Sequence, residues 1–414
     1  MSLRQFSILV ADDTPDIVSS VVEQLTRLSK KFKHSVRVYT ASSATDVFSV
    51  LNSKEVDCLL LDYHFEGGMS GDEIMDAIVD PFGQKLIFLM SARPPSELEH
   101  MVVRRHKRLG DRFRFLRKPF EPLELQEVYL QIVDFLCSRS YPCPLAYTYQ
   151  VMKGATTAQA RLTGLKDLVE SIIIYSVAVL TADCKRLGTL SALKPKLSGT
   201  APMTLGAWLK WLAAAIGCIA NQSRKPFMPE LLRVFSETDG VDALRLLYEF
   251  KDQVRDNELG HGFVREEDWY SRTLDSYSKP IEVLFDCLLF TTRYPLVAVE
   301  TIDLPQLQTI FRYTVRSLMG SSAPFPVHVV DTPERLTKDA VFAFAPSGIF
   351  LSLHPVLRFC MCDKCSIRRL FSLERVSEST FKYRAHCNHQ LGYQKDGRED
   401  EWFKDLPAAL FSAL

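Results

Sequence analysis

Short apolar runs alternate with helical segments along the first 140 residues. The runs have the length of buried strands and span residues 6–11, 36–41, 58–62, 85–90 and 113–116. Elsewhere in this part, apolar residues recur at three- and four-residue intervals, which predicts helices over residues 17–28, 44–51, 74–78, 97–109 and 123–136. This alternation predicts an α/β fold, doubly wound around a parallel five-stranded sheet.

The pattern changes twice after residue 140. Residues 141–154 contain Pro142 and Pro144 and are interpreted as a stiff linker. Helical stripes follow over residues 155–320, the last of them at 307–318, and predict an all-α bundle. Over residues 321–414, a small antiparallel β domain is predicted from short β runs at 327–330, 340–344, 349–353, 369–373 and 380–384. The chain is therefore expected to be multidomain, with the first domain spanning residues 1–140.

The composition narrows the class of protein. The 50 Lys and Arg residues balance the 50 Asp and Glu residues, so overall charge does not imply a nucleic-acid partner. The most apolar stretches, residues 171–180 and 207–220, are shorter than the roughly 20 residues that span a bilayer. The first residues show no signal-peptide pattern, and most of the ten cysteines stand singly within apolar runs. We therefore expect a cytoplasmic protein with no membrane partner.

Polar residues stand where four of the predicted strands end. Asp12 and Asp13 follow the first strand, Asp62 closes the third, Ser91 follows the fourth and Lys118 follows the fifth. The carboxyl ends of parallel strands meet at one crevice, so these side chains are expected to converge. Three carboxylates suit Mg²⁺, and a lysine beside the metal neutralises the oxygens of a transferring phosphoryl group. The pattern predicts that Asp62 is a phosphoryl acceptor.

These positions resemble the receiver domain of two-component response regulators. The resemblance is carried by Asp12-Asp13, Asp62, Ser91-Ala92, Phe115 and Lys118-Pro119. It covers about a third of the chain and implies a flavodoxin-like receiver that takes a phosphoryl group from a sensor histidine kinase. The implied Mg²⁺ ligands are Asp12, Asp13, Asp62 and the backbone carbonyl of His64. It also implies a switch in which Ser91 moves toward the phosphate and Phe115 turns inward.

A basic segment precedes Lys118. It contains Arg104, Arg105, Lys107, Arg108, Arg112, Arg114 and Arg117. One interpretation is a solvated face of a helix and the following strand. The other is a docking face for an acidic partner, for the C-terminal part of this chain, or for nucleic acid. Receivers commonly dimerise through this face, so a homodimer through the first domain is a further expectation. A homodimer through the helical domain is the alternative.

A second motif lies in the helical region, at Arg255, Asn257 and His261. An arginine, an asparagine and a histidine this close are able to bind phosphate and to act as acid or base. The segment resembles the Arg-x(4–6)-His signature of HEPN helical domains, many of which are metal-independent RNases. The resemblance implies that Arg255 and His261 are catalytic and that Asn257 assists. The alternative interpretation is that these residues cap a helix end and bond locally.

A third group contains cysteine and histidine. Cys362 and Cys365 have the spacing of a metal-binding knuckle, and Cys387 with His389 supplies a second pair. Four such ligands suit tetrahedral Zn²⁺ in a structural site, and the alternative is a set of reduced thiols in a small sheet. The string Leu351-Ser352-Leu353-His354-Pro355, followed by a cysteine pair, resembles a β module that often follows HEPN-like helices in bacterial signalling and defence proteins.

The sequence therefore predicts a response regulator in a two-component phosphorelay, with a setting in bacterial stress or phage-defence signalling. Its output region is expected to act by protein interaction or as a phosphate buffer, without catalysis of its own. The first alternative is an RNase gated by phosphorylation. The second is a nucleic-acid-binding regulator, although no helix-turn-helix pattern is visible.

Overall fold

A computed structural model describes most of the chain. The described residues are 5–32, 35–54, 56–66, 68–78, 85–94, 112–197, 204–236, 242–254, 266–303, 310–321, 325–338, 340–376, 380–385 and 390–394. Internal contacts divide the chain into two compact units, Met1–Arg139 and Ser140–Leu414, which we call unit 1 and unit 2.

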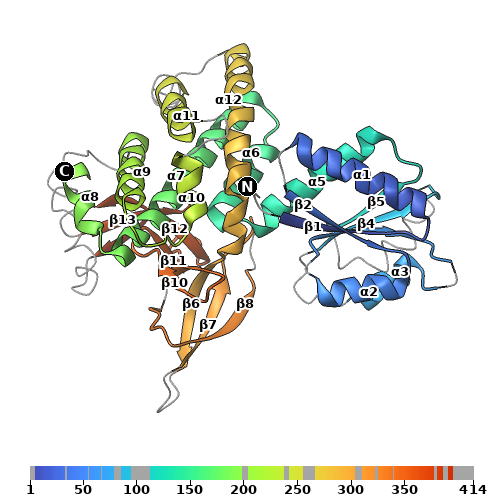
Figure 1. Cartoon of the computed structure of the whole chain (residues 1–414). Coiled ribbons are helices and arrows are strands. Elements are labelled where there is room, and N and C mark those ends of the chain that lie inside the picture. Colours follow the sequence, from blue (N-terminus) through green and yellow to red (C-terminus); the bar gives the residue numbers. More distant parts are fainter. Residues whose placement is uncertain are drawn as a thin grey trace. The chain divides into compact units, whose positions relative to one another are not determined.

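Unit 1 contains five strands and four described helices. In chain order these are β1 (Gln5–Ala11), α1 (Pro15–Lys31), β2 (Ser35–Ala41), α2 (Ala44–Ser53), β3 (Cys58–Asp62), α3 (Gly71–Ala77), β4 (Leu86–Ser91), β5 (Phe113–Arg117) and α5 (Pro122–Ser140). The strands form one sheet in the order β2-β1-β3-β4-β5, with every neighbouring pair parallel. Helices α1 and α5 cover one face of this sheet, and α2 and α3 cover the other (Figure 1). The predicted doubly wound parallel sheet is confirmed.

Local sequence explains where the elements of unit 1 begin. Strand β3 is buried along its whole length because its leucines pack under helices on both faces. Helix α2 begins after Ser43, whose hydroxyl accepts a hydrogen bond from the amide of Asp46. Helix α3 begins with a capping box formed by Ser70 and Glu73. These caps set the lengths of the loops that follow the strands. The helix predicted at residues 97–109 lies outside the described residues.

Unit 2 contains both helices and sheets. Its helical elements are α6 (Cys143–Gly154), α7 (Ala158–Leu187), α8 (Leu190–Leu197), α9 (Leu205–Ala220), α10 (Pro229–Ser236), α11 (Ala243–Phe250), α12 (Glu267–Cys287) and the 3-10 helix η3 (Leu288–Arg293). Helix α7 is the centre of this packing, because α6, α9 and α12 all contact it. Nineteen of its 30 residues are buried, which only a helix surrounded by other elements can achieve.

Two antiparallel sheets complete unit 2. One has the order β10-β9-β6-β7-β8 and the other the order β11-β12-β13-β14. Their strands are β6 (Leu296–Asp303), β7 (Phe311–Ser317), β8 (Val327–Thr332), β9 (Val341–Phe344), β10 (Phe350–Ser352), β11 (Leu357–Met361), β12 (Arg368–Val376), β13 (Thr380–Ala385) and β14 (Gln390–Gln394). The predicted β runs coincide with β8, β9, β10, β12 and β13. Strands β11 and β14 were not predicted.

The predicted linker at residues 141–154 is wrong, because this segment is mostly helix α6. Pro142 and Pro144 stand at the helix start, where proline is tolerated, rather than in an extended spacer. Tyr149 is buried and stacks on Phe285, with ring centroids 4.6 Å apart. Helix α6 is therefore part of the core of unit 2.

The helix predicted at residues 307–318 is also wrong. Strand β7 occupies residues 311–317, and its buried residues Tyr313 and Val315 alternate with more exposed ones, which is the period of a strand. The expected all-α bundle over residues 155–320 therefore ends in strands. Strand β6 pairs with β9, so one sheet crosses the boundary expected between residues 320 and 321. Helices and strands of this part form one compact unit.

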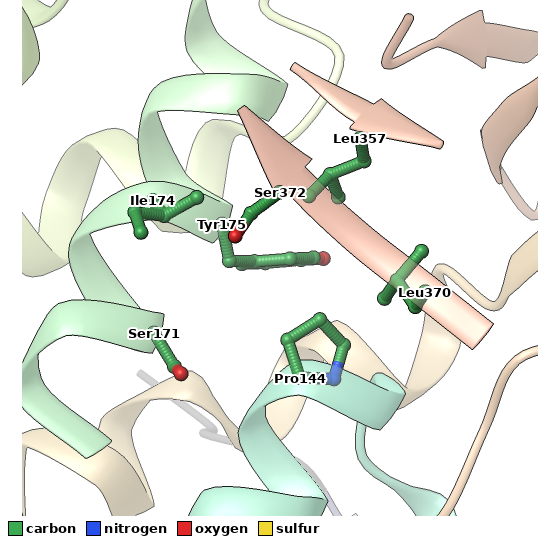
Figure 2. Close-up of a pocket in the computed structure, with 7 residues that line it drawn as sticks. All are labelled: Pro144, Ser171, Ile174, Tyr175, Leu357, Leu370 and Ser372. Atoms are coloured by element: carbon green, nitrogen blue, oxygen red, sulfur yellow. The ribbon is translucent and has the colours of Figure 1, made fainter. Parts of the chain in front are cut away.

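A small cavity lies where α6 and α7 meet the second sheet of unit 2. It is lined by Pro144, Ser171, Ile174, Tyr175, Leu357, Leu370 and Ser372 (Figure 2). Its volume of about 10 Å³ is close to the space that one water molecule needs, which is too small for a cofactor or substrate. We interpret it as imperfect packing between helix and sheet.

Among the described helices, none combines the length and the apolar character needed to cross a membrane.

Candidate functional site

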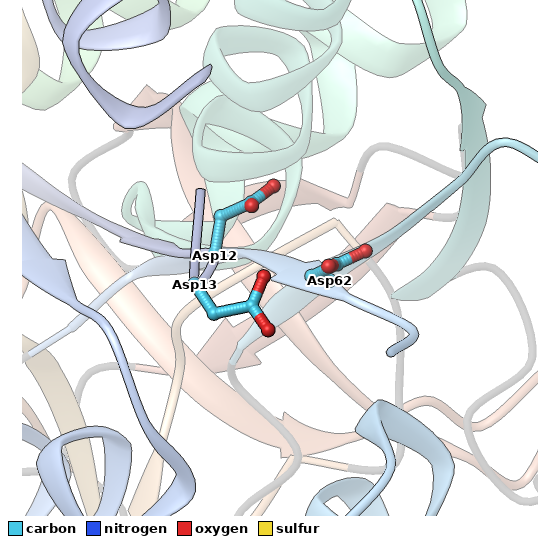
Figure 3. A group of neighbouring side chains, drawn as sticks. All are labelled: Asp12, Asp13 and Asp62. Atoms are coloured by element: carbon cyan, nitrogen blue, oxygen red, sulfur yellow. The ribbon is translucent and has the colours of Figure 1, made fainter. Parts of the chain in front are cut away.

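The candidate site lies at the carboxyl edge of the sheet in unit 1. Asp12 and Asp13 follow β1, Asp62 is the last residue of β3, Ser91 is the last residue of β4, and Lys118 follows β5. These four strands are neighbours in the sheet and run parallel, so their ends open on one crevice. The carboxylates of Asp12, Asp13 and Asp62 lie close together there (Figure 3). The sequence therefore identified residues that the fold brings together.

Lys118 bridges two of the three carboxylates. Its ammonium nitrogen lies 2.5 Å from Oδ2 of Asp12 and 2.8 Å from Oδ1 of Asp62. The Asp12 side chain is fully buried, and the side chains of Asp62 and Lys118 are 8% and 12% exposed. Charge pairs at this depth are only weakly screened, so each group strongly affects the others.

Backbone amides hold the acidic pair in place. The amide of Thr14 donates to Oδ1 of Asp12 at 2.9 Å, and the amide of Glu66 donates to Oδ2 of Asp13 at 2.6 Å. The loop after β3 thereby contacts the loop after β1 at the edge of the crevice. Hydrogen-bond partners of this kind cannot be identified from sequence, because every residue type except proline presents the same amide.

Ser91 and Phe115 lie on the two strands nearest Lys118. The Ser91 hydroxyl is buried and accepts a hydrogen bond from the Arg93 amide at 3.1 Å, while the Ser91 carbonyl accepts one from the Lys118 amide at 2.7 Å. Phe115 is half-buried and its ring contacts Phe113 edge-on, with centroids 4.8 Å apart. Ser91 is thus at the rim of the crevice, bonded to its own loop.

Gly71 is a positioning residue that sequence reasoning did not single out. A Cβ at this residue would lie 2.2 Å from the backbone oxygen of Asp62 and 2.9 Å from Leu89, so only glycine allows this approach. The Gly71 amide donates to the carbonyl of Tyr63 at 2.9 Å. The start of α3 is therefore pressed against the backbone of Asp62. The available signal was a glycine three residues before the helix predicted at residues 74–78.

The pKa of Asp62 is raised above the ordinary carboxyl value. The main cause is burial, and the charge of Asp12 acts in the same direction. The Lys118 ammonium and the backbone amide of His64 oppose the shift, because both stabilise the ionised carboxylate. Asp62 is thus a carboxylate whose ionised form depends on nearby positive charge.

The donor set fits a hard divalent cation. Asp12, Asp13 and Asp62 each offer a carboxylate oxygen, and these atoms lie within 4.8 Å of one another. Three carboxylates face one ammonium group, which leaves excess negative charge in a partly buried place. Oxygen ligands and excess negative charge are what Mg²⁺ binds in proteins. Among the described residues, no other group of three or more Asp, Glu, His or Cys side chains meets the same distance criterion.

The other predicted sites lie partly or wholly outside the described residues. Arg255, Asn257 and His261 are outside them, and so are Cys387 and His389 of the predicted zinc site. Cys362 is buried and Cys365 half-buried in the turn between β11 and β12. Of the basic segment, Arg112, Arg114 and Arg117 are described, and the members from Arg104 to Arg108 are not.

Solved structures similar to this chain match its N-terminal part, about a third of its length. No protein-family model matches the chain, and no curated protein matches it. A solved structure titled a BeF3-activated DrrB receiver domain is 22% identical, with a TM-score of 0.26, over 32% of this chain and 99% of that chain. The signal receiver domain of an HD domain-containing protein from Pseudomonas fluorescens is 22% identical, with a TM-score of 0.27, over 32% of this chain and 90% of that chain. The chemotaxis protein CheY4 of Vibrio cholerae is 19% identical, with a TM-score of 0.26, over 31% of this chain and 99% of that chain.

Proposed function

We propose that unit 1 is a phosphoryl-accepting receiver domain of a response regulator and that Asp62 is the acceptor. The observation that carries the proposal is the placement of Lys118, whose ammonium lies within 3 Å of both Asp12 and Asp62 at the ends of adjacent strands. A purely structural ion pair needs one carboxylate. This site has three, and the surplus negative charge matches a site that binds a cation and then a phosphoryl group.

The proposed chemistry is an in-line phosphoryl transfer. A carboxylate oxygen of Asp62 forms a bond to phosphorus as the bond from phosphorus to the donor breaks, and the leaving imidazole nitrogen of a phosphohistidine takes up a proton. Lys118 keeps Asp62 ionised before the transfer and then faces the new phosphate oxygens. Ser91, at the rim of the same crevice, donates its hydroxyl hydrogen to the phosphate after leaving the Arg93 amide.

Asp12, Asp13 and Asp62, with the backbone carbonyl of His64, would hold Mg²⁺. When bound, Mg²⁺ supplies positive charge to the oxygens of the transferring group. Around it, the Glu66 and Thr14 amides keep Asp13 and Asp12 in place, and Gly71 lets α3 support the Asp62 backbone. Binding can be measured without phosphoryl transfer, because Mg²⁺ that binds only the folded form raises the unfolding temperature of wild type but not of Asp13→Asn.

The proposed partner is a sensor histidine kinase, and the proposed location is the cytoplasm. The proposed response is a population shift in which the phosphate attracts Ser91 and Phe115 turns inward. The added charge and acceptor oxygens of the phosphate favour this state. The Ser91 hydroxyl gives up its hydrogen bond with the Arg93 amide and gains one with an ionised phosphate oxygen.

For unit 2, we propose an output role through protein interaction. Phosphorylation-gated RNase activity of Arg255, Asn257 and His261 stays a prediction, as does nucleic-acid binding by the segment from Arg104 to Arg117. The zinc site of Cys362, Cys365, Cys387 and His389 also stays a prediction. One observation supports its first half: the Cys362 amide donates to Ile367 at 3.0 Å and its carbonyl accepts from Ser366 at 2.8 Å, which closes a tight turn around Cys365.

The test uses the full chain with acetyl phosphate and Mg²⁺. We expect the intact mass of wild type to increase by one phosphoryl group and the increase to be lost when Mg²⁺ is chelated. A peptide map should locate the modification at Asp62. Modification at another residue, or the absence of any modification with both acetyl phosphate and a panel of phosphorylated kinases, would contradict the proposal.

A further inference from the structure

The stretch from Cys184 to Phe235 is strongly basic although the chain as a whole is neutral. It contains eight Lys or Arg residues and one acidic residue, Glu230, which gives a net charge of +7 in a chain whose formal net charge is zero. The basic residues are Lys185, Arg186, Lys194, Lys196, Lys210, Arg224, Lys225 and Arg233. A concentration of this kind is a local electrostatic feature that the total charge conceals.

The fold gathers four of these cations at one place in unit 2, which we call the basic platform. Lys185 and Arg186 occupy the last turn of α7, and Arg224 and Lys225 lie in the loop between α9 and α10. All four residues are exposed. The loop and the helix end are directly joined, because Nη2 of Arg186 donates to the carbonyl of Lys225 at 2.9 Å.

The loop that carries Arg224 and Lys225 is anchored at both ends. On one side, the Gln222 amide donates to the carbonyl of Ile219 at 2.9 Å. On the other, Phe227 is buried and its amide donates to Oδ2 of Asp183 at 2.8 Å. Asp183 is itself almost fully buried in α7, and its Oδ1 also accepts a hydrogen bond from Nε of Arg186 at 2.7 Å. Asp183 thus fixes the loop and balances the charge of Arg186, which leaves Lys185, Arg224 and Lys225 as the cations of the platform that it does not pair. The two cations are therefore displayed from a fixed backbone, so little backbone entropy is lost when they bind a ligand.

An ion pair lies next to the platform loop. Arg293 is exposed and lies 2.7 Å from Glu230, which also accepts a hydrogen bond from the Tyr294 hydroxyl at 3.1 Å. The ring of Tyr294 lies 5.7 Å from that of Phe227, directly after the platform loop. Glu230 is thus the acidic neighbour in this stretch, and Arg293 and Tyr294 already occupy its carboxylate.

The exposed side chains of the platform indicate the class of ligand. In the loop, the residues before Arg224 are Asn221, Gln222 and Ser223, all exposed and all polar, while Phe227 and Met228 point into the core. A protein interface normally centres on apolar side chains, and this surface offers none among its described residues. Guanidinium and ammonium groups on a fixed, polar surface match a repeating anion, of which a phosphodiester backbone is the common example.

We propose that the basic platform, Lys185, Arg186, Arg224 and Lys225, binds nucleic acid through its phosphodiester backbone. Cations at the end of α7 also complement the helix dipole, which accounts for Lys185 and Arg186. That explanation does not reach Arg224 and Lys225, which lie outside any helix. The site is separate from the crevice around Asp62, and it does not use the basic segment from Arg104 to Arg117.

The test measures binding of the full chain to a fluorescein-labelled single-stranded RNA, and in parallel to a duplex DNA, by anisotropy over a series of salt concentrations. The variant is Arg224→Ala with Lys225→Ala. The control removes two exposed cations from α12, Arg272→Ala with Lys279→Ala, and so changes the net charge equally. Circular dichroism checks that both variants fold.

We expect the platform variant to bind RNA at least about 10-fold more weakly at low salt. The slope of log affinity against log salt should fall by about 1.4, since each phosphate contact on a single strand contributes about 0.7. The control should stay within about twofold of wild type. Whichever of the two probes, single-stranded RNA or duplex DNA, binds more tightly identifies the form of nucleic acid that the platform prefers.

The proposal is wrong if wild type binds neither nucleic acid at low salt, or if the platform variant keeps the wild-type affinity and slope. It is also wrong if an acidic peptide of equal charge binds more tightly than either nucleic acid. All binding is measured without a phosphoryl donor, so failure of this proposal is distinguishable from failure of the phosphoryl-acceptor proposal.

Discussion

Asp62 and Asp183 are two buried aspartates of this chain. Their pKa values are raised for the same physical reason, but the groups that surround them differ. In both, burial is the largest cause and a nearby cation opposes it. At Asp183, Oδ1 accepts from Arg186 at 2.7 Å and Oδ2 accepts from Phe227 at 2.8 Å, so both oxygens are satisfied by groups of the fold. At Asp62, the ammonium group of Lys118 is shared with the carboxylate of Asp12, and the carboxylate of Asp13 is close by. A raised pKa alone therefore does not identify a reactive carboxylate, whereas an excess of acceptors over donors does.

The largest effect is expected from the ammonium at the crevice. Lys118→Met should lower the rate of acetyl phosphate-dependent modification of Asp62 by about 100-fold or more, because it removes the charge that stabilises the transferring group. The rate is followed by intact mass. Lys54→Met, at an exposed residue after α2, is the matched control and should react at the wild-type rate. If the Lys118 variant reacts as fast as this control, the ammonium group has no role in the reaction. The distinction drawn here between Asp62 as a reactive carboxylate and Asp183 as a structural one would then be wrong.

The second effect concerns the satisfied aspartate. Asp183→Ala should lower the free energy of unfolding of unit 2 by about 3 kcal/mol, since it leaves a buried amide and an arginine without their partner. The value is at the lower end for a buried pair because the Arg186 side chain is 33% exposed and regains water. Urea unfolding measures the loss, and Asp275→Ala on α12 is the exposed control. Phosphorylation of Asp62 should not change, and a parallel loss of phosphorylation would contradict the separation of roles.

The third effect tests the support behind Asp62. Gly71→Ala should lower the stability of unit 1 by about 1 to 3 kcal/mol, because the new methyl group meets the backbone of Asp62 rather than a movable side chain. Gly154→Ala is the control, since no atom lies within 4 Å of a Cβ there. Thermal unfolding compares the two. Equal stability of both variants would mean that α3 is free to retreat from Asp62.

The smallest effect is a change in pH dependence at Asp183. Folding raises the pKa of Asp183. At a pH between the pKa of the unfolded state and that of the folded state, the folded state therefore holds a proton that the unfolded state has lost. The stability that this group contributes therefore falls as pH rises through that interval. We expect Asp183→Asn to gain stability relative to wild type as pH rises through it, measured by urea unfolding at a series of pH values. A difference that stays constant with pH would show that burial does not govern this carboxyl.

Unit 1 was predictable because its information is local and periodic. A run such as Leu59-Leu60-Leu61 can only be a buried strand in this setting, and the residue that closes it falls at the crevice by topology alone. What the sequence does not contain is the hydrogen bonding of the backbone. The Glu66 amide at Asp13 depends on the path of a loop and not on a side chain.

Unit 2 was harder to predict because long-range pairing decides its structure. The strands β6 and β7 stand next to helices in sequence, and their apolar residues are also compatible with a helical stripe. They become strands by pairing with each other and with β9 and β8, which come later in the chain. At α6, two prolines suggested a linker, yet buried residues such as Leu145 and Tyr149, one helical turn apart, favoured a helix.

The most direct test of the central claim is the mass of the full chain after incubation with acetyl phosphate and Mg²⁺, wild type against Asp62→Asn. We predict that wild type gains one phosphoryl group and that Asp62→Asn gains none, while circular dichroism shows both chains folded. Equal phosphorylation of the two chains would contradict the assignment of Asp62 as the acceptor.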